Sequence, residues 1–179
     1  MKYFIASDIH GSAFYCEKMI AAFKEHSAHK LILLGDILYH GPRNDLPKDY
    51  SPKTVIDLLN NFKEKILCVR GNCDTEVDQM VLSFPILADF GFLQINDQTI
   101  YLTHGHHINE IPFQEDDIVL SGHTHIPVAE KTNDFININP GSVSIPKENS
   151  PHSYIIFENN KFYFYNLETN EIYKTYNLK

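Results

Sequence analysis

Three short apolar runs in the first half of the chain constrain its fold more strongly than any other feature. They span residues 3–6, 31–34 and 65–69, and runs of this kind are typical of strands buried on both faces of a sheet. Between them, apolar residues recur at helical spacing over residues 16–23 and 55–62. This alternation of strand and helix predicts a parallel sheet with crossover helices.

The second half of the chain follows a different pattern. Residues 87–95 and 99–102 flank Asn96-Asp97-Gln98 and predict a hairpin with its turn there. Further short strands are expected at residues 118–120, 128–130, 135–138, 153–157 and 162–165, with a last hairpin turn at 168–171. Helical crossovers followed by hairpins predict two packed sheets with helices outside. The length fits a single domain, residues 1–179.

Residues with metal-binding side chains follow the ends of several expected strands. The densest example is Gly122-His123-Thr124-His125, directly after the apolar run 118–120. The full set comprises Asp8, His10, Asp36, Asn72, His104, His123 and His125. Because the loops at the carboxyl ends of strands carry the ligand sites of open α/β sheets, we expect these side chains to lie together. In isolation, an Asp at such a position also caps a helix and a single His is an ordinary hydrogen-bonded residue.

The chemical types of these side chains limit which metal ions they can bind. Carboxylate, imidazole and amide oxygen ligands suit manganese, iron, zinc or nickel. This many ligands can be shared between two ions, which in dinuclear sites lie ~3.5–4 Å apart and clamp the attacking and leaving oxygens of an in-line phosphoryl displacement. The sequence therefore predicts phosphate ester chemistry with a carboxylate that bridges two divalent ions.

Cysteine spacing and charge exclude several other classes. Cys16, Cys68 and Cys73 form no C-x-x-C pair, and none precedes an arginine at the spacing that a thiol phosphatase needs. A formal charge of −8 argues against an extended nucleic-acid binding face. An early charged residue at Asp8 argues against a signal peptide, and no apolar run is long enough to span a bilayer. We therefore expect no membrane contact and a cytoplasmic location.

The order of the motifs resembles that of the calcineurin-like metallophosphoesterases. The matching motifs are Asp8-x-His10, Gly35-Asp36, Gly71-Asn72-x-Asp74, Thr103-His104-Gly105 and Gly122-His123-x-His125. Two loops, Gly71-Asn72-Cys73-Asp74 and His40-Gly41-Pro42-Arg43-Asn44, are most similar to the YfcE-type phosphodiesterases. The resemblance implies an α/β fold, a four-layer α/β/β/α sandwich of two mixed sheets flanked by helices.

The resemblance also implies a ligand assignment. Asp8, His10 and His125 would hold a first metal ion, and Asp36 would bridge to a second. Asn72, His104 and His123 would hold the second ion, and Asn72 would also contact the substrate phosphate. Two divalent ions are expected, with manganese as the first choice and zinc, iron or nickel as alternatives.

The function expected from this site is a metal-dependent phosphodiesterase in which a metal-bridging water or hydroxide attacks phosphorus. Its substrate would be a small phosphodiester or nucleotide-like molecule. The same core also serves phosphomonoesterases and nucleotide pyrophosphohydrolases. A third hypothesis is a non-catalytic scaffold, because the small retromer subunit is similar in fold. Relatives of this size commonly pair, so a homodimer or a higher homo-oligomer is also expected.

Four further residues are candidates for catalysis in addition to Asn72. Cys73 stands where many relatives have a His that assists the leaving group, and a thiol is a poorer acid at neutral pH. We therefore expect weak turnover of esters with poor leaving groups. His40 would substitute only if its loop folds over the site. Arg43 either grips a phosphate or is solvated, and Asp74 is expected to orient a ligand or a loop.

Overall fold

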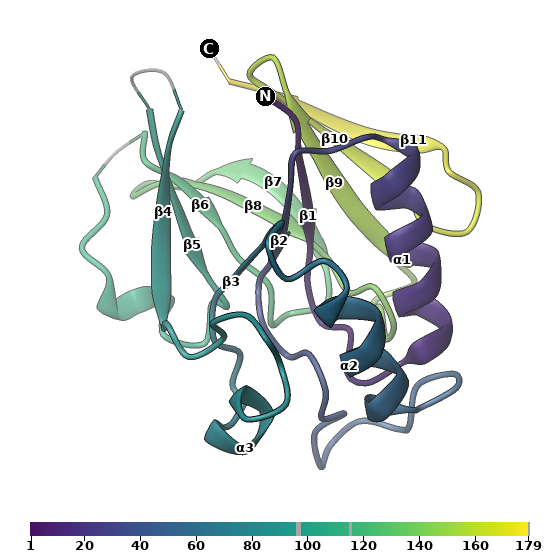
Figure 1. Ribbon diagram of the computed structural model, residues 1–179. Helices are drawn as coiled ribbons and strands as arrows, with labels where there is room; N and C mark the ends of the chain where they lie inside the picture. The colour runs from purple at the N-terminus through teal and green to yellow at the C-terminus, as the bar shows by residue number, and fades with distance from the viewer. Residues whose placement is uncertain (96–97, 115, 179) are drawn as a thin grey trace.

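The protein contains two mixed β-sheets packed face to face (Figure 1). The computed structural model describes residues 1–95, 98–114 and 116–178. The first sheet has the strand order β11-β10-β9-β1-β2-β3. Its strands are β1 (Tyr3–Ala6), β2 (Lys30–Leu33), β3 (Ile66–Cys68), β9 (Ser153–Glu158), β10 (Lys161–Asn166) and β11 (Ile172–Asn177). β1, β2 and β3 run parallel, whereas β9, β10 and β11 add antiparallel pairs.

The second sheet has the strand order β4-β5-β6-β8-β7. Its strands are β4 (Phe90–Ile95), β5 (Gln98–Thr103), β6 (Ile118–Leu120), β7 (Pro127–Lys131) and β8 (Ile136–Pro140). The middle strands β5, β6 and β8 are parallel, and β4 and β7 pair antiparallel at the two edges. β4 and β5 form the expected hairpin, but the turn predicted at Asn96 and Asp97 lies outside the described residues.

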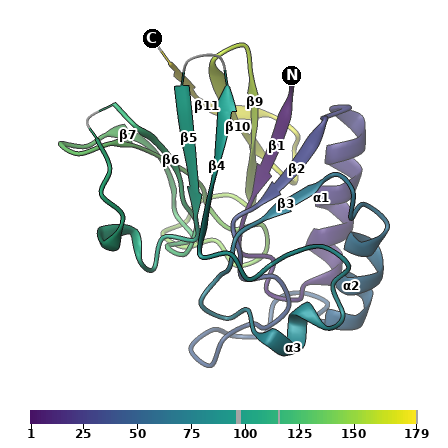
Figure 2. The ribbon, with the colours of Figure 1, turned by 60° about the vertical axis from the view of Figure 1, so that its left-hand side comes forward.

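The two main helices cover the outer face of the first sheet (Figures 1 and 2). They are α1 (Ala13–Glu25) and α2 (Pro52–Asn60). The N-cap hydroxyl of Ser12 accepts the Tyr15 N–H of α1 at 3.3 Å, and Pro52 opens α2, where its missing N–H costs nothing. Two short helical segments that the sequence did not predict follow later, α3 (Glu76–Gln79) and η1 (Ile108–Glu110).

The first strand shows why its apolar run is continuous. Successive side chains of a strand point to opposite faces. Phe4 and Ala6 therefore pack against the helices, whereas Tyr3 and Ile5 pack between the two sheets. All four residues are buried. β3 differs, because it forms an edge of the sheet and only Ile66 is fully buried. The expectation of a third strand buried throughout was therefore wrong.

The predicted α/β sandwich of two mixed sheets is confirmed. On the outer face of the second sheet, no long helix packs among the described residues; Phe113 is centred 5.3 Å from Tyr101 and 4.8 Å from Phe135, whereas Phe90 and Phe92 of β4 are exposed. Among the described residues, no helix is both long and apolar enough to cross a membrane.

The loops that follow the parallel strands meet at one end of the sandwich. In Figure 1 the loops after β1, β2 and β3 lie at the lower end, and both chain termini lie at the upper end. Backbone bonds join these loops, since the Asp8 N–H donates to Gly35 O at 3.1 Å and the Gly122 N–H donates to His104 O at 2.8 Å. The fold thus gathers the polar strand ends of both sheets at one place.

Candidate metal centre and active site

Strained backbone marks most of the candidate ligands. Asp8, His10, Asp36, His123 and His125 have φ values of 59°, 49°, 56°, 67° and 62°. These lie in the left-handed region, which costs a residue other than Gly on the order of 1–2 kcal/mol. Such strain persists only where the surrounding structure holds it, and it clusters at functional sites.

Hydrogen bonds from neighbouring loops hold this strained backbone in place. The carbonyl oxygen of Asp8 accepts from the hydroxyls of Ser142 at 2.8 Å and Ser144 at 3.1 Å. Its carboxylate Oδ2 accepts the N–H of His123 at 3.1 Å. A Cβ at Gly122 would collide with Ser7 Oγ and lie 3.0 Å from Asp8 Oδ2, so only Gly permits this approach. Two loops far apart in sequence therefore fix Asp8.

Asp8, His10 and His125 form a first cluster, and each is at most 3% exposed. Asp8 Oδ1 lies 3.4 Å from His10 Nε2 and 3.2 Å from His125 Nε2, and the two Nε2 atoms are 3.2 Å apart. The three atoms thus face one small volume, as the ligands of one ion would.

His104, Asn72 and His123 form a second cluster next to the first. His104 Nε2 lies 3.0 Å from Asn72 Oδ1 and 3.3 Å from His123 Nδ1. Asp36 connects the clusters, because its Oδ2 is 3.4 Å from His104 Nε2 and 3.6 Å from His10 Nε2. The structure thus brings together all seven residues of the predicted ligand set, in two groups that share one carboxylate.

Hydrogen bonds to backbone carbonyl groups fix the orientation of three imidazole rings. The Nδ1 atoms of His10, His104 and His125 lie 2.8, 2.6 and 2.8 Å from backbone carbonyl oxygens. A carbonyl only accepts, so each Nδ1 carries the proton. In the neutral ring Nε2 then holds a lone pair that points into the site, as in histidines that bind metal ions.

The carboxylate of Asp8 shows whether these residues suit a bound cation. Its Oδ1 atom is fully buried and accepts no hydrogen bond from any described residue. A buried oxygen of this kind is costly unless a donor or a cation satisfies it. The imidazole nitrogens nearest to it carry lone pairs in the neutral state, so a divalent cation fits this donor set.

The pKa shifts show the same attraction for positive charge. Burial would raise the pKa of Asp8, but His10 and His125 lower it to well below its usual range. Burial would lower the pKa of His104, but the hydrogen bond and charge of Asp36, together with the charge of Asp8, raise it to about 9. The site therefore stabilises ionised carboxylates and favours a cation between them.

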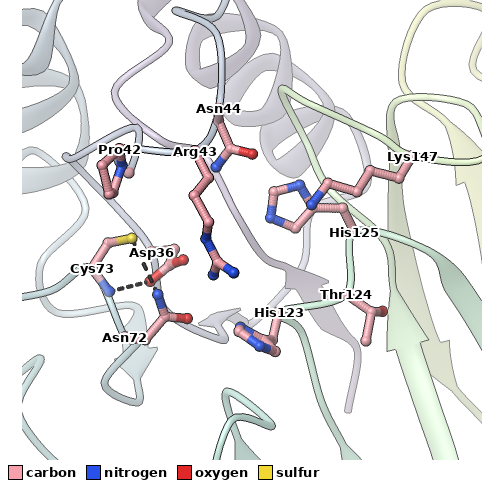
Figure 3. A pocket seen from close by; sticks show the side chains of 11 residues that line it. Asp36, Pro42, Arg43, Asn44, Asn72, Cys73, His123, Thr124, His125 and Lys147 are labelled. Atoms are coloured by element: carbon pink, nitrogen blue, oxygen red, sulfur yellow. Dashed lines mark hydrogen bonds between the residues drawn. The ribbon is translucent and has the colours of Figure 1, made fainter.

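Cys73 lies beside Asp36 rather than among the imidazoles. Its N–H donates to Asp36 Oδ1 at 2.8 Å, and its Sγ accepts from Asn72 Nδ2 at 3.3 Å (Figure 3). Burial and the nearby Asp36 raise the pKa of the Cys73 thiol to about 12. The group is therefore a neutral thiol at physiological pH and a weak proton donor.

Asp74 supports the loops instead of facing the ligands. It is 1% exposed, its Oδ2 accepts the N–H groups of Asp36 and Gly71 at 2.8 Å each, and its Oδ1 accepts that of Ile37 at 2.9 Å. Both oxygens thus join the ends of β2 and β3. This geometry makes Asp74 a positioning residue, of the loop-orienting kind that the sequence predicted.

A pocket of about 410 Å³ opens over the ligands. Its lining consists of Asp36, Gly41, Pro42, Arg43, Asn44, Asn72, Cys73, His123, Thr124, His125 and Lys147. Figure 3 shows Arg43 extending down into the pocket toward Asn72 and His123, while Lys147 enters from the right, on the side where His125 lies. Arg43 is therefore placed where it can meet a bound phosphate.

His40 does not take part in this pocket. Its ring packs between Tyr39 and Tyr50, with ring centres 4.8 and 5.2 Å away, and it is not among the lining residues. The loop does fold over the site, but the turn carries Arg43 inward and leaves His40 beside the tyrosines. The structure thus places the His40 ring beside two tyrosines, and a catalytic role for His40 stays a prediction.

Several residues of the site were missed from the sequence. Lys147 lines the pocket, and the Asn139 Nδ2 group donates to Gly122 O at 2.7 Å. Together with Ser142 and Ser144 they belong to a polar stretch after the run 135–138. The stretch Asn139-Pro140-Gly141-Ser142 was the available signal, since small polar residues directly follow a strand there as they do at the ligand loops.

Comparison with known proteins places this geometry in a family. A family model described as the calcineurin-like phosphoesterase superfamily domain matches residues 1–161. Phosphodiesterase YfcE of Escherichia coli (strain K12) is 46% identical over 162 residues, which cover 89% of this chain and 88% of that protein.

Solved structures of other proteins support the same family assignment. The structure of YfcE, a phosphoesterase from E. coli, has a TM-score of 0.95 at 42% identity and covers 100% of both chains. Vacuolar protein sorting 29 from Cryptosporidium parvum has a TM-score of 0.64 at 17% identity, covering 99% of this chain and 98% of that one, and shows the fold alone. The chain thus belongs to the calcineurin-like phosphoesterase superfamily and is a phosphoric ester hydrolase whose clustered ligands imply divalent metal ions.

Proposed function

We propose that the protein is a phosphodiesterase that works with two divalent ions held by the seven ligands. The observation that carries this proposal is the position of Asp36, whose Oδ2 lies within 3.6 Å of His10 Nε2 and 3.4 Å of His104 Nε2. A carboxylate between two separate ligand groups is what a pair of ions sharing one bridge requires.

The two groups divide the ligands between the ions. Asp8, His10 and His125 would hold one ion, while Asn72, His104 and His123 would hold the other. When bound, such ions act as Lewis acids and lower the pKa of coordinated water to about 7. The protein's part is to orient these ligands through buried backbone bonds and to expose Asn72 toward the phosphate in the pocket.

Cys73 supports a substrate whose leaving group needs no proton from a general acid. A thiol with a pKa of about 12 gives little help to a leaving alkoxide. The enzyme would then act best on esters whose leaving group departs without a proton, such as aryl diesters. Comparable rates on alkyl and aryl diesters would contradict this role of Cys73.

The similarity to phosphodiesterase YfcE also supports a diester substrate. Phosphomonoesterase and pyrophosphohydrolase activity remain the alternative reactions on the same core. Manganese is the proposed ion, with zinc, iron and nickel as competitors. The cytoplasmic location and the homodimer stay predictions, which cell fractionation and light scattering measure.

The test uses metal-stripped protein and bis-p-nitrophenyl phosphate. Manganese should restore release of p-nitrophenolate, whereas Asp36→Asn and His123→Ala should abolish it. Matched controls are Asp57→Asn and His107→Ala, which change exposed residues outside the pocket and should keep wild-type rates. Circular dichroism checks the fold of each variant. Wild-type protein without manganese-dependent turnover would overturn the proposal.

A separate measurement tests how the seven ligands are divided between the two ions. Metal content of each variant, measured by mass spectrometry after dialysis against manganese, should show loss of one of the two ions in His125→Ala and likewise in His123→Ala. Asp36→Asn should weaken both sites. Loss of both ions in either histidine variant would require a different division of the ligands.

A further inference from the structure

Two cationic side chains face the pocket beyond the metal ligands. Arg43 and Lys147 both line it, and Asp36 is the one carboxylate among its lining residues. The chain as a whole has 15 Lys and Arg against 23 Asp and Glu, so such a local excess of positive charge departs from its overall balance. In Figure 3 Arg43 reaches down into the pocket from the top of the view and Lys147 reaches in from the right.

A tight turn places Arg43 over the pocket. The N–H of Asn44 donates to Gly41 O at 3.4 Å, and the Asn44 side chain donates to His40 O at 2.8 Å. Gly41 takes a φ of 80°, and Pro42 occupies the second position of the turn, where its fixed φ is favourable. Arg43 therefore extends from a loop that is braced by its own hydrogen bonds.

The second cation is tied directly to a ligand loop. The N–H of Lys147 donates to the carbonyl oxygen of His125 at 3.2 Å. On its other side, Lys147 O accepts from the Ser150 hydroxyl at 2.6 Å and from the Ser150 N–H at 3.0 Å. The backbone from which the ammonium group extends is thus held in register with the candidate metal centre.

The reacting diester does not need both cations. A phosphodiester carries a single negative charge, and it would bind against the ligand side of the pocket. A phosphomonoester carries about 1.5 to 2 negative charges at pH 7. Arg offers a planar fork and Lys a compact charge, and both are regular phosphate ligands. On charge alone, the pair matches a second, dianionic group.

We propose that Arg43 and Lys147 together bind a second phosphate group, so that the preferred substrate is a phosphodiester whose retained arm ends in a phosphomonoester. The inference rests on the proposed phosphodiesterase function and names its substrate class. Binding of a remote group that does not react acts on the substrate and the transition state alike, so it lowers KM more than it raises kcat.

The experiment compares p-nitrophenyl diesters that differ only at the end of an ethyl arm. The arm ends in a methoxy group, a carboxylate or a phosphate, and p-nitrophenolate release reports cleavage of the same bond in each. With manganese-loaded wild-type protein, the phosphate ester should exceed the methoxy ester in kcat/KM by roughly ten- to a hundredfold, the range for hydrogen bonds to charged groups.

Variants locate the effect. Lys147→Gln and Arg43→Gln should each lower the ratio of kcat/KM between phosphate and methoxy esters by roughly tenfold, mainly through KM. Lys63→Gln, an exposed lysine outside the pocket, should leave the ratio unchanged. Because each ratio is taken within one variant, a partial loss of folded protein does not alter it.

The outcomes separate this inference from the proposed function. If all three esters are cleaved at similar kcat/KM, the second phosphate site is overturned and the phosphodiesterase stands. A carboxylate ester as good as the phosphate ester would also overturn it. If no ester is cleaved, the phosphodiesterase itself fails.

Discussion

The carboxylate of Asp74 offers the most informative single perturbation of this fold. It joins the ends of β2 and β3 by accepting three backbone N–H groups, from Asp36, Ile37 and Gly71. The N–H of Asp36 belongs to a residue held at a φ of 56°, so this bond also holds strained backbone next to both ligand clusters. Removing the carboxylate should reduce both stability and activity.

The expected magnitude follows from the number of N–H groups left without an acceptor. Each buried, unsatisfied N–H costs about 1–3 kcal/mol. Asp74→Ala leaves three, so the free energy of unfolding should fall by at least about 3 kcal/mol even if water relieves part of the loss. Asp74→Asn keeps an oxygen for Asp36 and Gly71 but points an amide at Ile37 N–H, so it should cost about 1–3 kcal/mol.

Burial places the cost of the Asn variant at the lower end of that range. Burial raises the pKa of Asp74 although the backbone N–H groups lower it, so the charged form is itself costly at this position. Asn carries no charge and avoids that cost. The Ala variant gains the same relief but loses every acceptor, which is why the two variants should separate.

Urea unfolding followed by circular dichroism measures the stabilities, with Asp57→Asn on the exposed face of α2 as the matched control. Manganese-dependent hydrolysis of bis-p-nitrophenyl phosphate measures the effect on the site. If Asp74→Ala and Asp74→Asn unfold at the same urea concentration with equal slopes, the count of unsatisfied N–H groups does not govern the loss and the reasoning is refuted.

Three further predictions follow from single contacts. Gly122→Ala should lower manganese-dependent kcat/KM more than tenfold, because overpacking costs about 1–3 kcal/mol and the added Cβ would displace Ser7 and Asp8. The control is Gly91→Ala, which should retain activity because its Cβ would meet nothing closer than 3.8 Å. Cys73, with a pKa of about 12, should resist iodoacetamide near pH 8, as peptide mass spectrometry would show; rapid labelling there would contradict the raised pKa. Burial, then Lys2, lowers the pKa of His26 below its unfolded value of about 6.5, so the unfolded chain binds the proton more readily and stability is lost as pH falls below that value. His26→Gln should therefore lose less stability than wild type between about pH 7 and pH 5 in urea unfolding, and equal losses would rule His26 out as the source.

The clustering of the candidate ligand residues was predictable because it depends on local signals. Asp8, Asp36 and Asn72 follow apolar runs, and parallel strands bring their carboxyl ends to one edge whatever the details of the loops. The sandwich of two sheets followed in the same way from the change of pattern near the middle of the chain. An apolar run does not reveal whether its strand lies at the edge of the sheet, so the sequence did not predict the partial exposure of β3.

Only the tertiary structure decided how the loops use these residues. His40 and Arg43 lie three positions apart, yet the turn at Gly41 sends the arginine into the pocket and leaves the histidine between two tyrosines. Lys147 joins the site through a bond to His125, a contact across 22 positions of sequence.

The sequence by itself therefore determined the types of the candidate ligand residues and the edge of the sheet where they meet, because strand periodicity and strand ends are local properties. The sharing of Asp36 between two clusters, the left-handed backbone of its neighbours and the pair of cations above them depend on contacts between loops distant in the chain. Those contacts exist only once both sheets have packed, so the folded structure alone decides them.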